Sequence, residues 1–428
     1  MGTRNARVGE AEPITLIIEK LVPGGDGLAR HDGKVVFVPA VLPGEKVRAR
    51  ILEAKKDFAR ASLVEILEAS PMRIEPPCPV AGRCGGCDWQ HIDYAEQLRQ
   101  KVAMTADALR RTGGLEFPGL AIEPGKPLRY RNRAQIHRDP GGRAGFLAKA
   151  SHDIVPVTSC PVAHPALDTL LRADGPADPG AAGVAGHRGS GPRQDERFAA
   201  WAHTLPASAG GKDFLVSGAA GPSEPGYQPS GFSEPGFPVE ILGREIHFDL
   251  RCFFQSNLEM LAKLLPYALD GLAGREAMDL YCGVGLFGAF LKDRFDRVVA
   301  VEENAVALAY ARRNIGPGRT ESGRTESGHL FLQGRLEDLI AEGRPELISA
   351  RPEVILVDPP RPGLDAGVRA YLADKQPPRL IYVSCNPVTL ARDLKTLLAE
   401  GFVLEDLRLF DFYPQTAHVE AVAKLKKA

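Results

Sequence analysis

Long apolar runs and a strong net charge are both missing from this chain of 428 residues. The longest apolar stretches, such as residues 35–42, are far too short to cross a bilayer, and the N-terminal residues lack the apolar core of a secretion signal. The net charge of −1 creates no overall field for nucleic acid or an acidic membrane, so any such surface must be local. We therefore expect a cytoplasmic protein without a membrane partner.

Cysteine is scarce, with seven residues at uneven spacing, and this odd number argues against a disulfide framework. Four of the cysteines form a candidate metal-binding set: Cys78, Cys84 and Cys87 in a glycine-rich stretch, and Cys160 further along. Four thiolates suit either zinc or an iron–sulfur cluster, and ligand type alone leaves both open. The Cys-x3-Cys-x2-Cys spacing of radical enzymes is absent, which argues against radical chemistry.

Turn residues divide the N-terminal part of the chain. Residues 10–70 consist of short apolar stretches separated by Gly- and Pro-containing turns, which predicts a small closed β-barrel of about five strands. A small β-sandwich is the alternative that this pattern leaves open.

Residues 71–250 are predicted to form a central α+β domain. The cysteine set is followed by a helix that ends at Gly113 and Gly114, and then by a β-hairpin or meander over residues 128–162. Residues 171–238 are rich in Gly, Pro and Ala and predict an irregular insertion, although 214–218 has the pattern of a strand.

Strands and helices alternate over residues 251–428, which predicts a mostly parallel, doubly wound sheet with antiparallel edge strands at its end. The turn CGVGLFG follows a strand and begins a helix, so Gly283 and Gly285 permit a ligand to approach the backbone. Glu302 ends the next strand, where a carboxylate accepts hydrogen bonds from ribose hydroxyls. Together with Asp279, these residues resemble the S-adenosylmethionine pocket of class I methyltransferases.

Three further residues suggest the reaction. Asp358 ends a later strand in VDPPRPGL, and Cys385 ends another in RLIYVSC. A thiol is needed when the methyl acceptor is an unactivated pyrimidine carbon, because addition of the thiolate at C6 makes C5 nucleophilic. The C5 proton must afterwards be removed, and Glu420 in HVEAVAKL is the candidate base. A buried core thiol and an exposed edge carboxylate are the alternatives for the two residues taken singly.

Two other features precede the doubly wound region. Gln255 lies in FFQSN, where its amide is a candidate hydrogen-bond partner for the cofactor or the base. Arg129, Arg131 and Arg133 alternate along a predicted strand and are expected on one face, as phosphate contacts or as a solvated edge.

Taken together, YVSCNPVTLARDL, DLYCGVGLFG, the cysteine spacing and HVEAV resemble the bacterial RNA uracil-5 methyltransferases, specifically the TRAM-containing, iron–sulfur 23S rRNA members. The resemblance implies an OB-like TRAM barrel, a central domain with a [4Fe-4S] cluster and a C-terminal class I (Rossmann-like) methyltransferase domain. It implies S-adenosylmethionine as cofactor and RNA as partner, and we expect a monomer. The implied ligands and catalytic groups are the following: cluster ligands Cys78, Cys84, Cys87 and Cys160; cofactor contacts Gln255, Tyr281, Glu302 and Asp358; nucleophile Cys385; base Glu420.

The chain departs from the family at the glycine motif, where many members have Asn and this chain has Leu286. We expect methylation of uridine C5 in 23S rRNA, with transfer RNA as the alternative substrate and a non-catalytic RNA-binding scaffold as the alternative class. The N-terminal barrel argues against a dedicated tRNA enzyme. The presence of Asp358, Cys385 and Glu420 together argues against a scaffold.

Overall fold

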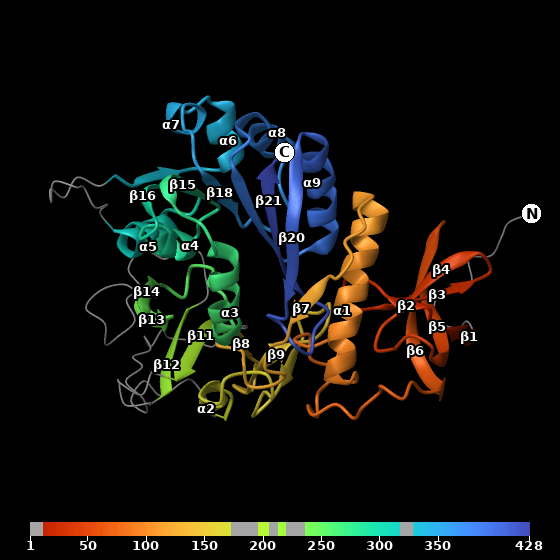
Figure 1. Ribbon diagram of the computed structural model, residues 1–428. Coiled ribbons are helices and arrows are strands. Elements are labelled where there is room, and N and C mark those ends of the chain that lie inside the picture. The colour runs from red at the N-terminus through yellow and green to blue at the C-terminus, as the bar shows by residue number, and fades with distance from the viewer. Residues whose placement is uncertain (1–11, 173–195, 205–212, 220–235, 317–327) are drawn as a thin grey trace, which may run out of the picture.

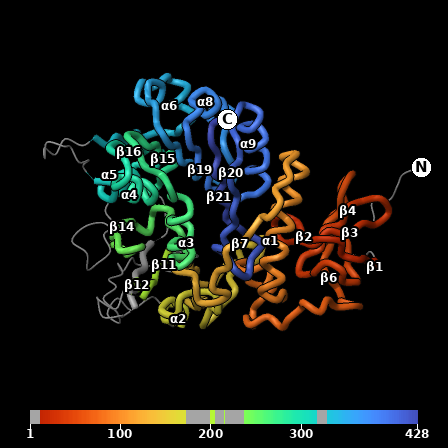
Figure 2. Tube along the Cα trace, in the orientation of Figure 1, coloured from red at the N-terminus to blue at the C-terminus, as the bar shows by residue number. Residues whose placement is uncertain are grey.

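The computed structural model describes residues 12–172, 196–204, 213–219, 236–316 and 328–428. A small N-terminal barrel, a central region and a large C-terminal sheet follow one another, and helix α1 (Tyr94–Ala108) runs between the barrel and the C-terminal part (Figure 1). The barrel lies on the opposite side of the molecule from helices α4 and α5 (Figure 2). In the part of the chain described, no helix is long and apolar enough to cross a membrane.

The N-terminal barrel has six strands, where the sequence predicts about five: β1 (Ile14–Ile17), β2 (Lys20–Leu21), β3 (Gly27–His31), β4 (Lys34–Val38), β5 (Lys46–Ala54) and β6 (Phe58–Glu68). Their order in the sheet is β1-β5-β6-β4-β3-β2. Only Ile18 and Glu19 separate β1 from β2, so the two end strands are halves of one bent strand. This bend brings the ends of the sheet together around an aliphatic core that includes Val36 and Val47.

The central region contains the predicted meander as strands β8 (Arg133–Arg138), β9 (Ala144–Leu147) and β10 (Ile154–Pro156), followed by helix α2 (Leu167–Arg172). Strands β11 (Glu196–Thr204) and β12 (Asp213–Ala219) extend this sheet from β8, in the order β10-β9-β8-β11-β12. Strand β12 confirms the strand predicted at 214–218.

The prediction of irregular structure is wrong for 196–204, because β11 pairs residue by residue with both β8 and β12. Its side chains Ala199 and Trp201 join the core. The stretches 173–195, 205–212 and 220–235 of the predicted insertion, and residues 317–327 of the tandem RTESG segment, lie outside the described residues.

The C-terminal sheet has eight strands in the described residues, in the order β17-β16-β15-β18-β19-β21-β20-β7. Their bounds are β7 (Ala121–Glu123), β15 (Gly274–Leu280), β16 (Phe295–Glu302), β17 (Leu330–Gln333), β18 (Val354–Val357), β19 (Arg379–Ser384), β20 (Phe402–Phe410) and β21 (Glu420–Lys427). The first five in sheet order are parallel, as predicted. Strands β20 and β21 are antiparallel as expected, but neither forms the edge, because the distant β7 pairs with β20.

Helices cover both faces of this sheet: α3 (Leu258–Leu269), α4 (Leu286–Leu291) and α5 (Ala305–Ile315) on one, and α6 (Leu336–Ala341), α7 (Pro345–Ile348), α8 (Ala366–Lys375) and α9 (Pro387–Ala399) on the other. Neighbouring strand residues alternate between the two cores, so that Ala277 and Val298 face α3–α5 while Met278 and Val299 face α6–α9. The hairpin β13 (Phe237–Ile241) and β14 (Arg244–Phe248) completes the first core.

A π-helical turn (Leu109–Gly113) extends α1, and Gly114 ends it in a left-handed conformation with φ 65°, as the two glycines predict. Leu109 inserts into the second core of the C-terminal sheet. Together with β7, this contact joins residues of the predicted central domain to the C-terminal sheet. The boundaries at 70 and 250 stay a prediction.

Candidate active site

One large cavity, of about 1590 Å³, opens at the carboxyl edge of the C-terminal sheet and extends to the central sheet. A typical ligand pocket is about 300–1,000 Å³, so this cavity has room for more than one ligand. Most of the residues singled out in the sequence line it: Gln255, Tyr281, Gly283, Glu302, Asp358, Cys385 and Glu420, together with Cys78, Cys84, Cys87 and Cys160. The fold therefore gathers side chains that are up to 342 positions apart in the chain, from Cys78 to Glu420.

The parallel strands explain this convergence. Strands β15, β18 and β19 end at Leu280, Val357 and Ser384, so the cavity residues Tyr281, Asp358 and Cys385 each follow directly. The carboxyl ends of parallel strands meet at one edge of a sheet, which is where ligands of doubly wound folds bind.

The glycine turn after β15 has an unusual backbone. Tyr281 and Gly283 both adopt positive φ angles, 64° and 55°. A Cβ atom on Gly283 would meet no heavy atom within 4 Å, so the turn has open space beside it. The Glu302 carboxylate accepts hydrogen bonds from the backbone N–H groups of Gly283, at 2.9 Å, and Asn304, at 2.8 Å. Glu302 therefore stabilises the turn in addition to lining the cavity.

Gly285, expected to face a ligand, is missing from the described residues that line the cavity. It precedes α4 with φ 76°, and a Cβ atom there would lie 2.8 Å from Cα of Ala311 in α5. This glycine is needed for close packing of α4 on α5. Asp279 is fully buried below the turn, where its Oδ2 accepts a hydrogen bond of 2.8 Å from the N–H of Gly288.

Cys385 and Glu420 lie at adjacent positions of neighbouring strands, because Ser384 in β19 pairs with Ala421 in β21. Burial, followed by the charges of the nearby Glu420 and Asp358 carboxylates, raises the pKa of the Cys385 thiol to about 11, although Arg361 acts in the opposite direction. The free thiol is therefore protonated at neutral pH.

Glu420 is buried, Asp358 is half-buried, and the charge of Asp358 acts on Glu420. Burial and the neighbouring Asp279 raise the pKa of Asp358 to about 7. Burial raises the pKa of Glu420 well above its usual range, and the negative charge of Asp358 acts in the same direction. Paired carboxyl groups of this kind hold a proton strongly, which suits a site that removes one from carbon.

Gln255 precedes α3, whose N-cap Asn257 accepts a hydrogen bond from the N–H of Met260 and donates one to the carbonyl of Phe412. The side-chain oxygen of Gln255 is buried and has no hydrogen-bond partner among the described residues. Such an unsatisfied acceptor in a cavity is typical of a ligand contact.

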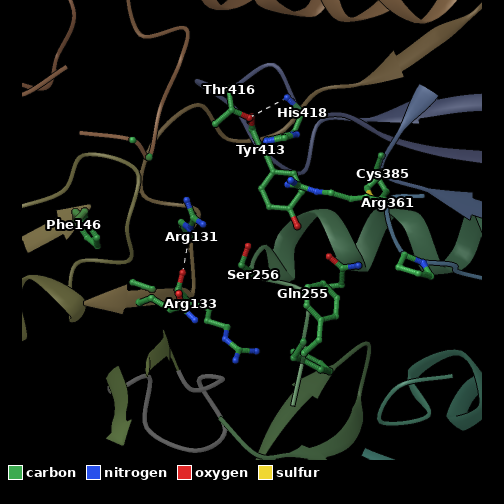
Figure 3. Close-up of a pocket in the computed structure, with 18 of the residues that line it drawn as sticks. Arg131, Arg133, Phe146, Gln255, Ser256, Arg361, Cys385, Tyr413, Thr416 and His418 are labelled. Atoms are coloured by element: carbon green, nitrogen blue, oxygen red, sulfur yellow. Dashed lines mark hydrogen bonds between the residues drawn. The ribbon is translucent and has the colours of Figure 1, made fainter. Parts of the chain in front are cut away.

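The cavity residues that the sequence did not single out include Arg361, Tyr413 and His418. Figure 3 shows Tyr413, Gln255 and Cys385 around the same open space, with Arg131 across it. Burial raises the pKa of Tyr413 to about 12, while the side chain of Ser256 hydrogen-bonds its phenol. Arg361 follows DPP at the end of β18 and could have been found from that position, whereas Tyr413 lies in a loop without a sequence signal.

The four predicted cysteine ligands line the far side of the cavity. All are free, and the Sγ of Cys84 accepts a hydrogen bond of 3.4 Å from the N–H of Gly86. Burial raises the pKa of Cys87 to about 12. Within the described ranges no group of three or more His, Cys, Asp or Glu side chains is arranged to hold a metal ion.

The predicted arginine strip is wrong as a strand face. Strand β8 begins only at Arg133, and Arg129 has a positive φ of 57°. Arg129 pairs with Asp168 at 2.9 Å, and Arg133 donates to the carbonyl of Cys252 at 2.5 Å. Arg131 and Arg133 nevertheless line the cavity.

Comparison with known proteins shows which family of enzymes this chain resembles. A profile described as tRNA (Uracil-5-)-methyltransferase matches residues 238–327 and 332–428, and a TRAM domain profile matches residues 8–64. A relative from Gloeobacter violaceus, named only as an uncharacterised RNA methyltransferase, is 36% identical, with 98% of this chain and 97% of the relative covered. The 23S rRNA (uracil(1939)-C(5))-methyltransferase RlmD of Pectobacterium atrosepticum is 33% identical, with 96% and 93% covered.

Among solved structures, the tRNA (uracil-54, C5)-methyltransferase of Pyrococcus abyssi, in complex with S-adenosyl-L-homocysteine, superposes with a TM-score of 0.69. It is 22% identical, and the match covers 96% of this chain and all of the other, so it establishes the fold.

The fold, the strand-end cavity and these matches define a methyltransferase that acts on RNA. The chain belongs to the RNA uracil-5-methyltransferase family, in the group that carries an N-terminal TRAM domain.

Proposed function

We propose that this enzyme methylates C5 of a uridine in 23S rRNA, with S-adenosylmethionine as methyl donor and a transient bond between Cys385 and C6 of the base. The observation that carries the proposal is the meeting of the thiol, the carboxylate pair and the glycine turn in one cavity. The choice of 23S rRNA is supported by the RlmD relatives, which are named for that substrate and match nearly the whole chain.

The residues present fit the proposed cofactor. The turn at Gly283 leaves open space beside its backbone, and the buried oxygen of Gln255 lacks a partner among the described residues. We infer that these two residues, with Tyr281, Glu302 and Asp358, bind S-adenosylmethionine. When bound, it supplies an electrophilic methyl group, whose transfer leaves a neutral thioether.

The chain supplies the activation of the base. The thiol of Cys385 gives its proton to water, and the sulfur bonds to C6 of the uracil, so that the electron pair of the C5–C6 double bond moves to the C4 carbonyl oxygen. When this electron pair moves back from the C4 oxygen, C5 becomes the nucleophile that attacks the methyl group. Glu420 in its ionised form then takes the proton from C5. The electron pair of the broken C5–H bond then forms the C5–C6 double bond again, and the Cys385 thiolate leaves C6. Because burial next to Asp358 raises the pKa of Glu420, its carboxylate is a stronger base than an exposed one.

A fluorine substitution tests the covalent step. RNA with 5-fluorouridine at the target has no C5 proton to remove, so wild-type enzyme should remain joined to it in the presence of S-adenosylmethionine. Cys385→Ala should give no adduct and no product, whereas Glu420→Gln should accumulate adduct even on ordinary uridine. Methylation by Cys385→Ala at the wild-type rate would refute the mechanism.

The substrate is tested separately. Mass mapping of RNA from a deletion strain should show loss of 5-methyluridine from 23S rRNA, with tRNA unchanged. Loss from tRNA instead would establish the alternative substrate.

We further propose that Cys78, Cys84, Cys87 and Cys160 hold a [4Fe-4S] cluster. The donor set supports this, because all four thiols line the cavity, lie close enough for their charges to act on one another, and Cys84 Sγ already accepts a backbone N–H, as cluster ligands commonly do. Anaerobically purified protein should contain iron and sulfide and absorb visible light. Cys160→Ala should lose these signals, whereas Cys252→Ala, a buried cysteine outside the set, should keep them. Zinc in place of iron would contradict the proposal.

A further inference from the structure

We propose that the N-terminal barrel and the end of the cysteine loop (residues 78–89) position the catalytic base Glu420. They do so through a buried contact region, here called the joint, that is formed by Gly25, Trp89, Gln415 and Ala417. The barrel then has a role in the chemical step in addition to any contact with RNA. This inference rests on the proposed function of Glu420.

The segment of residues 411–419 connects β20 to β21 and ends immediately before Glu420. It supplies three residues to the cavity: Tyr413, Thr416 and His418. The rings of Tyr413 and His418 contact each other edge to face, with centroids 6.1 Å apart. Strand pairing sets the register of Glu420, and this short segment leads directly into it and supplies Tyr413, on which the charge of Glu420 acts.

The barrel contacts this segment through its turn between β2 and β3. The indole N–H of Trp89, which is fully buried, donates a hydrogen bond of 3.1 Å to the carbonyl of Gly25. A Cβ atom on Gly25 would lie only 3.2 Å from Cβ of Ala417 and 3.2 Å from the Trp89 indole nitrogen. With φ 93°, Gly25 adopts a backbone conformation that favours glycine. Barrel, tryptophan and segment are thus in close contact, with Trp89 and Ala417 in one apolar core.

The end of the cysteine loop holds the same segment by its backbone. The N–H groups of Asp88 and Trp89 both donate to the carbonyl of Gln415, at 3.1 and 3.0 Å. Gln97 of α1, which is fully buried, accepts a hydrogen bond from the N–H of Gln415 at 2.8 Å and donates to its side-chain oxygen at 2.9 Å. Cys87 is adjacent to Asp88 in the chain, so the proposed cluster and the base-bearing segment share this attachment.

Gln415 shows that these contacts determine the conformation of the segment. Its φ of 68° lies in the left-handed region, which is strained for a residue with a side chain. The bonds from Gln97, Asp88 and Trp89 hold it there. Without them the segment would relax toward a more common conformation and move the residues on either side of Gln415.

Displacement of the base predicts a specific defect. Formation of the sulfur–carbon bond and methyl transfer precede proton removal, so a misplaced Glu420 leaves methylated RNA attached to Cys385. Loss of RNA binding alone would lower turnover without such an adduct.

The test uses the full-length enzyme with two variants of the joint. Trp89→Phe removes the N–H to Gly25 and keeps most of the apolar contact, and Ala417→Gly removes the methyl group that packs against the barrel. Each variant should bind target RNA with near wild-type Kd but show kcat lower by about tenfold or more, as expected for small misplacements of catalytic groups. Each should also accumulate covalent protein–RNA species on ordinary uridine RNA and show faster amide hydrogen exchange over residues 411–419.

Asp107→Asn is the matched control. It removes the ion pair of 2.6 Å between α1 and Lys20 of the barrel without contact to the segment, and should leave kcat and exchange over residues 411–419 unchanged. Wild-type kcat and exchange in Ala417→Gly would overturn the proposal, as would a lower kcat without adduct. Ala417→Gly decides the matter if Trp89→Phe does not fold. Failure of the wild-type enzyme to react with 5-fluorouridine RNA would refute the proposed function instead. Hydrogen exchange over residues 411–419 in the variants would still test whether the joint holds this segment.

Discussion

Asp279 offers a quantitative test of the electrostatics below the cofactor turn. Its carboxyl group is fully buried, and one oxygen, Oδ1, has no partner among the described residues. Burial raises its pKa from 3.8 to about 7, and the charge of Glu302 contributes. In Asp279→Asn the side chain stays the same shape and its oxygen still accepts the N–H of Gly288.

The direction in which pH changes the free energy of unfolding follows from proton binding to Asp279. Between pH 4 and 7 the folded protein keeps the Asp279 proton while the unfolded chain releases it, so rising pH favours unfolding. At 1.36 kcal/mol per pKa unit, the change from 3.8 to about 7 corresponds to about 4 kcal/mol of stability lost over that range. Asn cannot ionise and does not contribute this loss.

The measurement is urea unfolding followed by circular dichroism at several pH values from 4.5 to 8.5. The free energy of unfolding of Asp279→Asn minus that of wild type should rise by about 3 kcal/mol over this pH range, because part of the full effect lies below pH 4.5. Asp57→Asn, which replaces an exposed carboxyl group in the same way, serves as the control variant. If the curves for wild type and Asp279→Asn run parallel, the buried carboxyl is not protonated in the folded state and the reasoning fails.

Three other predictions concern single sites. The rate at which iodoacetamide alkylates Cys385, followed by peptide mass spectrometry, should rise up to about pH 11, and Arg361→Leu should move this midpoint higher because it removes the positive charge that lowers the thiol pKa. Lys101→Met should lower the free energy of unfolding by roughly 3–5 kcal/mol, because it leaves the fully buried Asp411 carboxylate without its ion-pair partner. Recovery of stability in a double variant with Asp411→Leu would separate charge burial from packing. Gly145→Ala should lower the melting temperature and cost about 3 kcal/mol, since its Cβ would lie 2.2 Å from a carbonyl oxygen of the neighbouring strand.

The sequence predicted the doubly wound sheet and most of its cavity residues for a simple reason. In a parallel sheet, a residue directly after a strand is placed by the strand itself, so Tyr281, Asp358 and Cys385 could be located from local pattern alone. Glu420 was predicted from its motif, although the register that sets it beside Cys385 arises from pairing between β19 and β21.

Other features depend on contacts between distant parts of the chain and were missed. Tyr413 enters the cavity because its loop is held by α1 and by the cysteine loop. The arginines at 129–133 were assigned to one strand because alternation alone shows neither the positive φ of Arg129 nor its ion pair with Asp168. Strand β11 was missed because its alanine-rich sequence lies in a Gly- and Pro-rich stretch, and only pairing with β8 reveals it.

Strand β7 has a consequence for how the catalytic sheet can be separated from the rest of the chain. The three residues of β7 lie nearly 280 positions before their partner strand β20 in the sequence, and they cover its outer edge. A fragment beginning at residue 251 would expose that edge to self-association and leave Asp411 without Lys101. Evolution or engineering that transfers this methyltransferase sheet to a new host protein must therefore carry residues 94–123 with it.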